Sequence, residues 1–141
     1  MGVNNRSFVA GAGGKFPTAA FQVLTISRET QIGNSQADFE VGSIRLPSDS
    51  DWQLVSAHVW ARAVTSDPTA ELLDDGTAIT DAVDIVAGAQ TEITFTGPVR
   101  LAGGSELQLE VNTDSGDDVT DVQVTIVIRP YPLAEAGVAV S

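Results

Sequence analysis

The chain contains no cysteine, one histidine and one methionine, and Lys15 is its only lysine. Without cysteine, thiol catalysis, thiolate zinc sites and disulfide cross-links are excluded. A Ser-His-Asp triad has only His58 as its base, and no GxSxG elbow accompanies any serine. No hydrophobic run approaches the roughly 20 residues that a membrane-spanning helix needs. The N-terminus also lacks the apolar core of a signal peptide, so we expect neither a membrane partner nor secretion.

Charge of one sign dominates the composition. Nineteen acidic and seven basic residues give a formal net charge of −12. Such a field repels phosphate backbones, so the sequence predicts no nucleic-acid partner. The 141 residues suffice for one domain that buries a core without metal or disulfides. We expect a soluble intracellular product, or part of something assembled inside a cell.

The sequence divides into three parts. Residues 1–18 are rich in Gly, Ala and Asn with only scattered apolar anchors, so we expect an arm that is flexible or ordered by a partner. Residues 19–130 alternate short stretches of Val, Ile, Thr and Leu with Gly, Pro, Asp and Ser clusters, which is typical of a β domain. Pro130 and Pro132 then hold residues 131–141 in an extended tail.

Alternation of apolar and polar residues identifies the strands. In "ELQLEVN" and "DVQVTIVIRP" one face of each strand is apolar, which predicts half-buried strands. The expected inward residues are Leu107, Leu109, Val111, Val122, Val124, Ile126 and Ile128. The apolar phase slips by one residue at Gly42, which predicts a β-bulge. Asp75 and Gly76 lie between two apolar runs and predict a two-residue type I′ hairpin.

Eight strands are expected. They lie near residues 20–27, 37–46, 52–64, 69–74, 77–86, 91–96, 105–113 and 120–129. No long segment has the 3.6-residue period of a helix. The predicted fold class is therefore all-β, an antiparallel two-sheet sandwich of jelly-roll type with an extended N-terminal arm.

Several acidic or glycine-rich clusters are candidate chemical sites. "DSGDD" and "PSDSDW" offer carboxylates to a cation but lack the ligand spacing of an EF-hand, and such residues favour ordinary turns. The outward acids Glu92, Glu106, Glu110 and Asp121 fit a solvent face better than a glycosidase pair. "GAGG" before Lys15 follows no strand and precedes no helix, so it is not a phosphate loop. The sequence predicts no catalytic residue, cofactor or metal.

The stretch "DWQLVSAHVWARA" holds both tryptophans and the histidine. If it is one continuous strand, its two faces differ in kind. The predicted core face carries Val55, Ala57, Val59, Ala61 and Ala63. The predicted outer face carries the interface candidates Trp52, His58, Trp60 and Arg62. Aromatic and arginine side chains are enriched in interfaces, which favours a contact with another subunit or with the arm. A core with the faces reversed, and a ligand site, stay as alternatives.

Residues 52–129 resemble a group of small β-sandwich proteins of tailed-phage particles. The resemblance rests on "QLVSAHVWARAV", "AELLDDGTAIT" and "VDIVAGAQTEITFTGPVRLAGGSELQLEVNTDSGDDVTDVQVTIVI" in this order. It implies a virion protein, a decoration or cement subunit on the outer capsid surface that stabilises the shell. It further implies a homotrimer that contacts the major capsid protein and sister subunits, with no enzymatic activity.

Two other interpretations share the fold. A glycan-binding β-sandwich module would use Trp60 or Trp52 to stack on sugar, and a tail or fibre component would differ only in its place on the particle. For the decoration subunit, we expect Phe8 and Phe16 to anchor the arm on the capsid or on sister subunits.

Overall fold

The structure, a computed structural model, describes residues 21–131. The predicted arm with Phe8 and Phe16, and the tail after Tyr131, lie outside these residues. The ten strands are β1 (Gln22–Arg28), β2 (Gln36–Arg45), β3 (Trp52–Thr65), β4 (Thr69–Asp74), β5 (Thr77–Ala78), β6 (Val83–Asp84), β7 (Thr91–Glu92), β8 (Arg100–Leu101), β9 (Glu106–Thr113) and β10 (Asp118–Pro130). Residues 21–131 contain no helix, and thus none that is long and apolar enough to cross a membrane.

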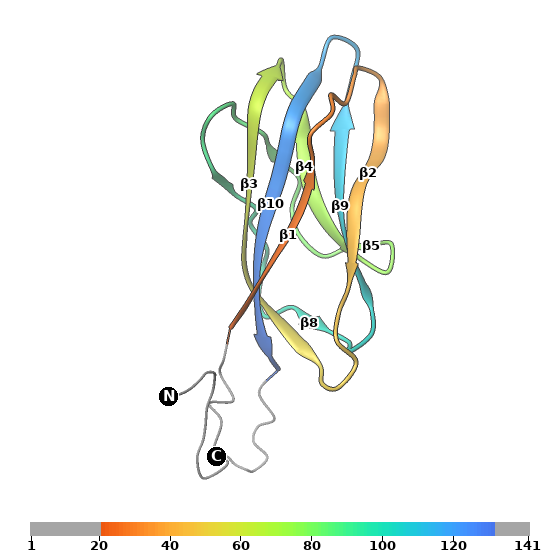
Figure 1. Ribbon diagram of the computed structural model, residues 1–141, viewed down its shortest axis with the longest axis vertical. Helices are drawn as coiled ribbons and strands as arrows, with labels where there is room; N and C mark the ends of the chain where they lie inside the picture. The colour runs from red at the N-terminus through yellow and green to blue at the C-terminus, as the bar shows by residue number, and fades with distance from the viewer. Residues whose placement is uncertain (1–20, 132–141) are drawn as a thin grey trace.

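The strands form two antiparallel sheets that pack face to face (Figure 1). The first sheet has the order β1-β10-β3-β7, with β8 also paired to β3, and the second has the order β2-β9-β4-β5, with β6 also paired to β4. The first four strands alternate between the sheets, β9 then pairs with β4 and β2 in the second sheet, and β10 returns to the first sheet between β1 and β3. The predicted fold class is confirmed.

Alternation along the long strands builds the core. All seven residues expected to face inward from β9 and β10 are at most 1% exposed. Each fully buried Leu, Ile or Val side chain contributes about 1.5–3 kcal/mol relative to an exposed one. Ile26 from β1, Leu72 from β4 and Ile93 complete the layer between the sheets. The sandwich is thus stabilised by one continuous apolar layer.

Two predicted local features are confirmed. The pairing of β2 with β9 shifts between Glu40 and Gly42, which is the expected bulge. A methyl group added at Gly42 would lie 2.9 Å from Cγ2 of Ile26, so glycine also allows the close approach of the two sheets. Asp75 and Gly76 have φ angles of 50° and 84° and connect β4 to β5 in a two-residue turn.

The segment between β5 and β9 departs from the predicted strands. The expected strand 77–86 is only β5 and β6, because its pairing with β4 is interrupted between them, where the Asp81 N–H donates to the Thr94 carbonyl at 2.8 Å. The expected strand 91–96 shortens to β7, and β8 was not predicted. The apolar side chains of Ile85, Ile93 and Leu101 are buried and fix this irregular segment along β3.

Candidate functional site

The outer face of the first sheet gathers the aromatic and polar residues that the sequence singled out. Register places them in rows across β1, β10 and β3. The rows are Val23, Val127 and Ser56, then Thr25, Thr125 and His58, then Ser27, Gln123 and Trp60. None of these nine side chains carries a formal charge when His58 is neutral, and the row of His58 ends at the exposed Glu92 of β7. For a chain of net charge −12, a face so poor in charge is a candidate contact surface.

Trp52 does not share this face, so its predicted outward placement is wrong. Its side chain is 3% exposed, and its Nε1–H donates to the Pro47 carbonyl oxygen at 3.0 Å. The reason is a bulge in β3: Ser56 is opposite Val127, but Leu54 is opposite Ile128. The extra residue, Val55, inverts the alternation, so Trp52 and Leu54 face the core.

The predicted core face of this stretch is right only in its middle. Ala57, Val59 and Ala61 are fully buried, whereas Val55 and Ala63 are exposed. Beyond Ala61 the alternation changes again, since the ladder skips Arg62 and Asp121, and Val64 packs against the core instead. This change removes Ala63 from the apolar layer.

Arg62 is an exposed residue of β3. Its Nε donates to a carboxylate oxygen of Asp121, which has a φ of 55° at the irregular position of β10. A surface ion pair contributes at most about 1 kcal/mol. Arg62 thus lies at one end of the outer face, where it forms an ion pair with Asp121 of the same chain.

An apolar patch occupies the end of this face nearest Gln22. We define the apolar patch as Phe21, Val23, Val55 and Val127. Phe21, Val23 and Val55 are 57%, 65% and 38% exposed and are three of the four large hydrophobic residues exposed among residues 21–131. The start of β1 pairs with the end of β10, so both ends of the described chain lie beside the patch (Figure 1).

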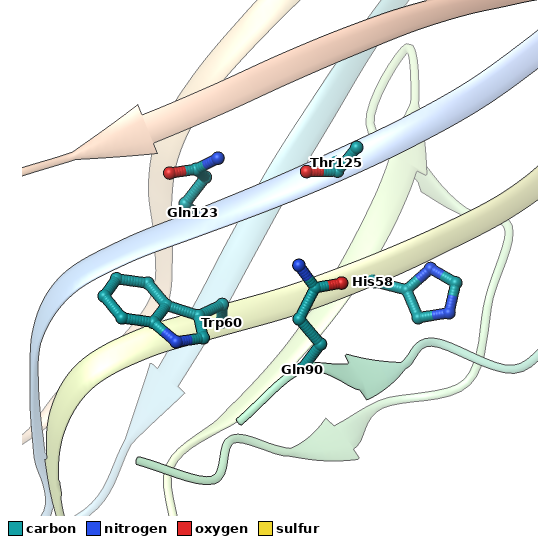
Figure 2. Close-up of a pocket in the computed structure, with 5 residues that line it drawn as sticks. All are labelled: His58, Trp60, Gln90, Gln123 and Thr125. Atoms are coloured by element: carbon teal, nitrogen blue, oxygen red, sulfur yellow. The ribbon is translucent and has the colours of Figure 1, made fainter. Parts of the chain in front are cut away.

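A shallow hollow lies on the same face farther along the strands. We define the Trp60 hollow by its lining residues His58, Trp60, Gln90, Gln123 and Thr125, which enclose about 290 Å³. Figure 2 shows the Gln90 amide between the indole of Trp60 and the imidazole of His58, with Gln123 and Thr125 on the neighbouring strand.

Gln90, Gln123 and Thr125 were not among the site residues predicted from the sequence. Alternation places Gln123 and Thr125 outward, but only the register of β10 against β3 sets them opposite Trp60 and His58. Gln90 comes from the irregular segment, which is attached to β3 by the Gly88 N–H to the Ala61 carbonyl at 2.8 Å. No local pattern identifies that attachment.

The second sheet has the opposite character. Glu110 of β9 lies directly between Glu40 of β2 and Glu71 of β4, so three glutamates form a row across its outer face. Partial burial of Glu110, a hydrogen bond with Glu71 and the charges of Asp38 and Glu71 raise the pKa of Glu110 from 4.5 to about 7. This acidic row makes the second sheet a poor surface for an acidic partner.

The acidic turns make hydrogen bonds within the chain. The Asp117 carboxylate is buried and accepts the N–H groups of Asp67 and Asp114. Asp51 accepts the N–H of Gly103 and then the guanidinium of Arg100, and these contacts lower its pKa. Within residues 21–131, no three acidic or histidine side chains form a group that would hold a metal ion. Asp51 and Asp117 thus stabilise turns.

Comparison with known proteins identifies the fold. No protein-family model and no curated protein sequence matches the chain. Among solved structures, it is similar to the C-terminal domain of EclA, described as a sugar-binding protein, with a TM-score of 0.52 and 15% identity over 85% of this chain and 87% of that chain. At this identity the likeness shows a shared fold alone.

Two further solved structures align less closely. Infectious bursal disease virus Gx strain has a TM-score of 0.42 and 12% identity over 89% of this chain and 37% of that chain. The C-terminal CBM6 of LamC, a marine laminarinase from Zobellia galactanivorans, has a TM-score of 0.36 and 12% identity over 74% of this chain and 99% of that chain. At these identities and TM-scores, neither structure indicates a role for this chain.

Proposed function

We propose that the protein is a structural subunit of a virion, a decoration subunit that binds the outer surface of a phage capsid. The observation that carries the proposal is the apolar patch. Large hydrophobic side chains that gather at one end of a charge-poor face, on an otherwise acidic molecule, are typical of a protein contact surface. The partners would be the major capsid protein and sister subunits.

The position of the apolar patch beside β1 supports a role in binding a partner. Phe21 lies just before β1, and β1 is an edge strand of the first sheet. Phe8 and Phe16 would therefore continue the apolar contact of Phe21 and Val23 onto the same partner. An arm that becomes ordered on binding wraps a large surface at the cost of its conformational entropy.

The resemblance to phage decoration proteins implies a trimer, and we infer this oligomeric state for the protein.

A fibre or tail component with the same fold would present the same apolar patch to another partner. Imaging of purified particles with a labelled chain distinguishes these places, since only a decoration subunit gives label over the whole head surface.

The experiment is a binding assay on phage heads that lack the protein. We expect Val23→Asp, which places a charge in the patch, to lower occupancy at least tenfold while the β fold is kept. Val86→Asp is the matched control, because Val86 is 49% exposed and lies outside the patch. Deletion of residues 1–17 should also weaken binding. Unchanged occupancy for both Val23→Asp and the deletion would refute the proposal, as would a chain that stays free in infected cells.

A further inference from the structure

The Trp60 hollow is separate from the apolar patch and has another chemistry. Its lining has one indole, one imidazole, two primary amides and one hydroxyl, and no carboxylate, ammonium or guanidinium group. Amides and hydroxyls both donate and accept hydrogen bonds, and an indole offers a flat apolar surface. The hollow therefore suits a ligand that has both apolar faces and many hydroxyl groups.

Other ligand classes fit less well. An anion would meet no cationic side chain in the hollow, and the net charge of −12 repels it. A cation would find no carboxylate there. A purely apolar ligand needs an enclosed apolar cavity, whereas this hollow is open and mostly polar. A neutral carbohydrate satisfies the remaining requirements.

A second hollow continues the first across the sheet. It encloses about 320 Å³ and shares Trp60 and Gln123 with the Trp60 hollow. Its other lining residues are Ser27, Arg28, Glu29, Asp121 and Val122, so it offers one guanidinium, two carboxylates and a hydroxyl as hydrogen-bond partners. Trp60 thus stands between two adjoining hollows, where a linear chain of sugars would pass over its ring.

We propose that the Trp60 hollow binds a neutral oligosaccharide, with one sugar ring stacked on the indole of Trp60. The amides of Gln90 and Gln123 and the hydroxyl of Thr125 would bond the hydroxyls of that sugar. The next sugar would occupy the second hollow beside Ser27. This site goes beyond the proposed capsid contact.

The backbone beneath the Trp60 hollow is fixed by strand pairing. Trp60 is paired with Gln123, and His58 with Thr125, on two long neighbouring strands. The Gly88 N–H to Ala61 carbonyl bond fixes the start of the loop that carries Gln90. A ligand therefore meets a backbone of defined geometry, which lowers the entropy cost of binding.

Titration of the full chain with cellohexaose, laminarihexaose and mannohexaose, followed by calorimetry, tests the proposal. We expect saturable binding of at least one probe. Trp60→Ala should weaken that binding about tenfold or more, and Trp60→Phe should keep most of it, since a phenyl ring also stacks. Gln123→Ala should weaken it less than Trp60→Ala. Circular dichroism checks that each variant is folded.

Thr25→Ala is the matched control, because Thr25 is an exposed residue of the same face that lies outside both hollows and outside the apolar patch. Binding should not change in this variant. Absence of saturable binding of all three probes at millimolar concentration would overturn the proposal, as would equal affinity in folded Trp60→Ala. Failure here leaves the capsid proposal standing, since that proposal depends on Val23 and the arm.

Discussion

At the scale of single residues, the two tryptophans show how one inserted residue in a strand decides whether a side chain faces the core or the solvent. Trp52 and Trp60 lie eight positions apart in one strand, an even number that places both on one face of a regular strand. The bulge at Val55 inverts the alternation between them. Trp52 therefore fills the core and Trp60 remains half-buried on the outer face.

We expect the two tryptophans to differ in their contribution to stability. Trp52→Ala should lower the free energy of unfolding by about 3–5 kcal/mol, because it opens a cavity and removes the donor to Pro47. Trp60→Ala should lower it by about 1 kcal/mol or less. Urea denaturation of both variants gives the comparison. Equal losses would contradict the assignment of Trp52 to the core and Trp60 to the surface.

At the scale of elements, the loops at the end of the sandwich near Tyr131 are joined by close backbone contacts. The Asp51 carboxylate accepts the Gly103 N–H at 3.0 Å, and the Tyr131 N–H donates to the Asp51 carbonyl at 2.9 Å. The guanidinium of Arg100 lies over the Tyr131 ring, 4.5 Å from its centroid. These contacts tie the turns before β3 and after β8 to the end of β10.

Gly103 is the position in these turns where an added side chain has the least room. A methyl group there would lie 2.3 Å from the Ser50 carbonyl oxygen, so Gly103→Ala must displace backbone. We expect it to lower the free energy of unfolding by about 1–3 kcal/mol. Gly33→Ala is the control, since nothing lies within 4 Å of its added methyl group. Equal melting temperatures of Gly103→Ala and Gly33→Ala would show that the turns at Ser50 and Gly103 accommodate the added methyl group without loss of stability.

Element types were largely predictable, but their ends were not. Alternation identified β9 and the inward face of β10, and the turn residues identified the hairpin at Asp75 and Gly76. The division of 77–86 into β5 and β6 was not predictable, because a hydrogen bond to Thr94 draws the chain toward the first sheet. Such a contact depends on packing and leaves no local pattern.

At the scale of the whole molecule, charge is divided between the two outer faces. The first sheet presents rows of uncharged side chains, and the second presents the row of Glu40, Glu110 and Glu71. Like charges directly opposite one another on neighbouring strands destabilise a sheet. The acidic row therefore lowers stability at neutral pH, while the first sheet is left as the face that another acidic molecule can approach.

This division predicts a pH dependence of stability. The folded chain holds a proton on Glu110 up to about pH 7, whereas the unfolded chain releases it near 4.5. The folded state thus binds more protons between these values, so the contribution of Glu110 to stability is complete below pH 4.5 and is lost as the pH rises to 7. Glu110→Gln mimics the protonated group.

The melting temperature of Glu110→Gln should exceed that of the wild type by a few degrees at about pH 8, and the two should converge at about pH 4. Glu29→Gln is the control, because Glu29 is an exposed residue outside this row. If the difference in melting temperature between Glu110→Gln and the wild type is the same at both pH values, the acidic row does not raise the pKa of Glu110.

The fold class, most of the core and the acidic character of the chain follow from the sequence alone, because alternation, turn residues and charge are local properties. The face that Trp52 occupies, the position of the apolar patch and the side chains around Trp60 became known from the folded structure. These depend on a bulge and on the register between strands far apart in the chain. A shift of one residue exchanges the inner and outer faces of a strand, and the packing of the opposite sheet selects between them.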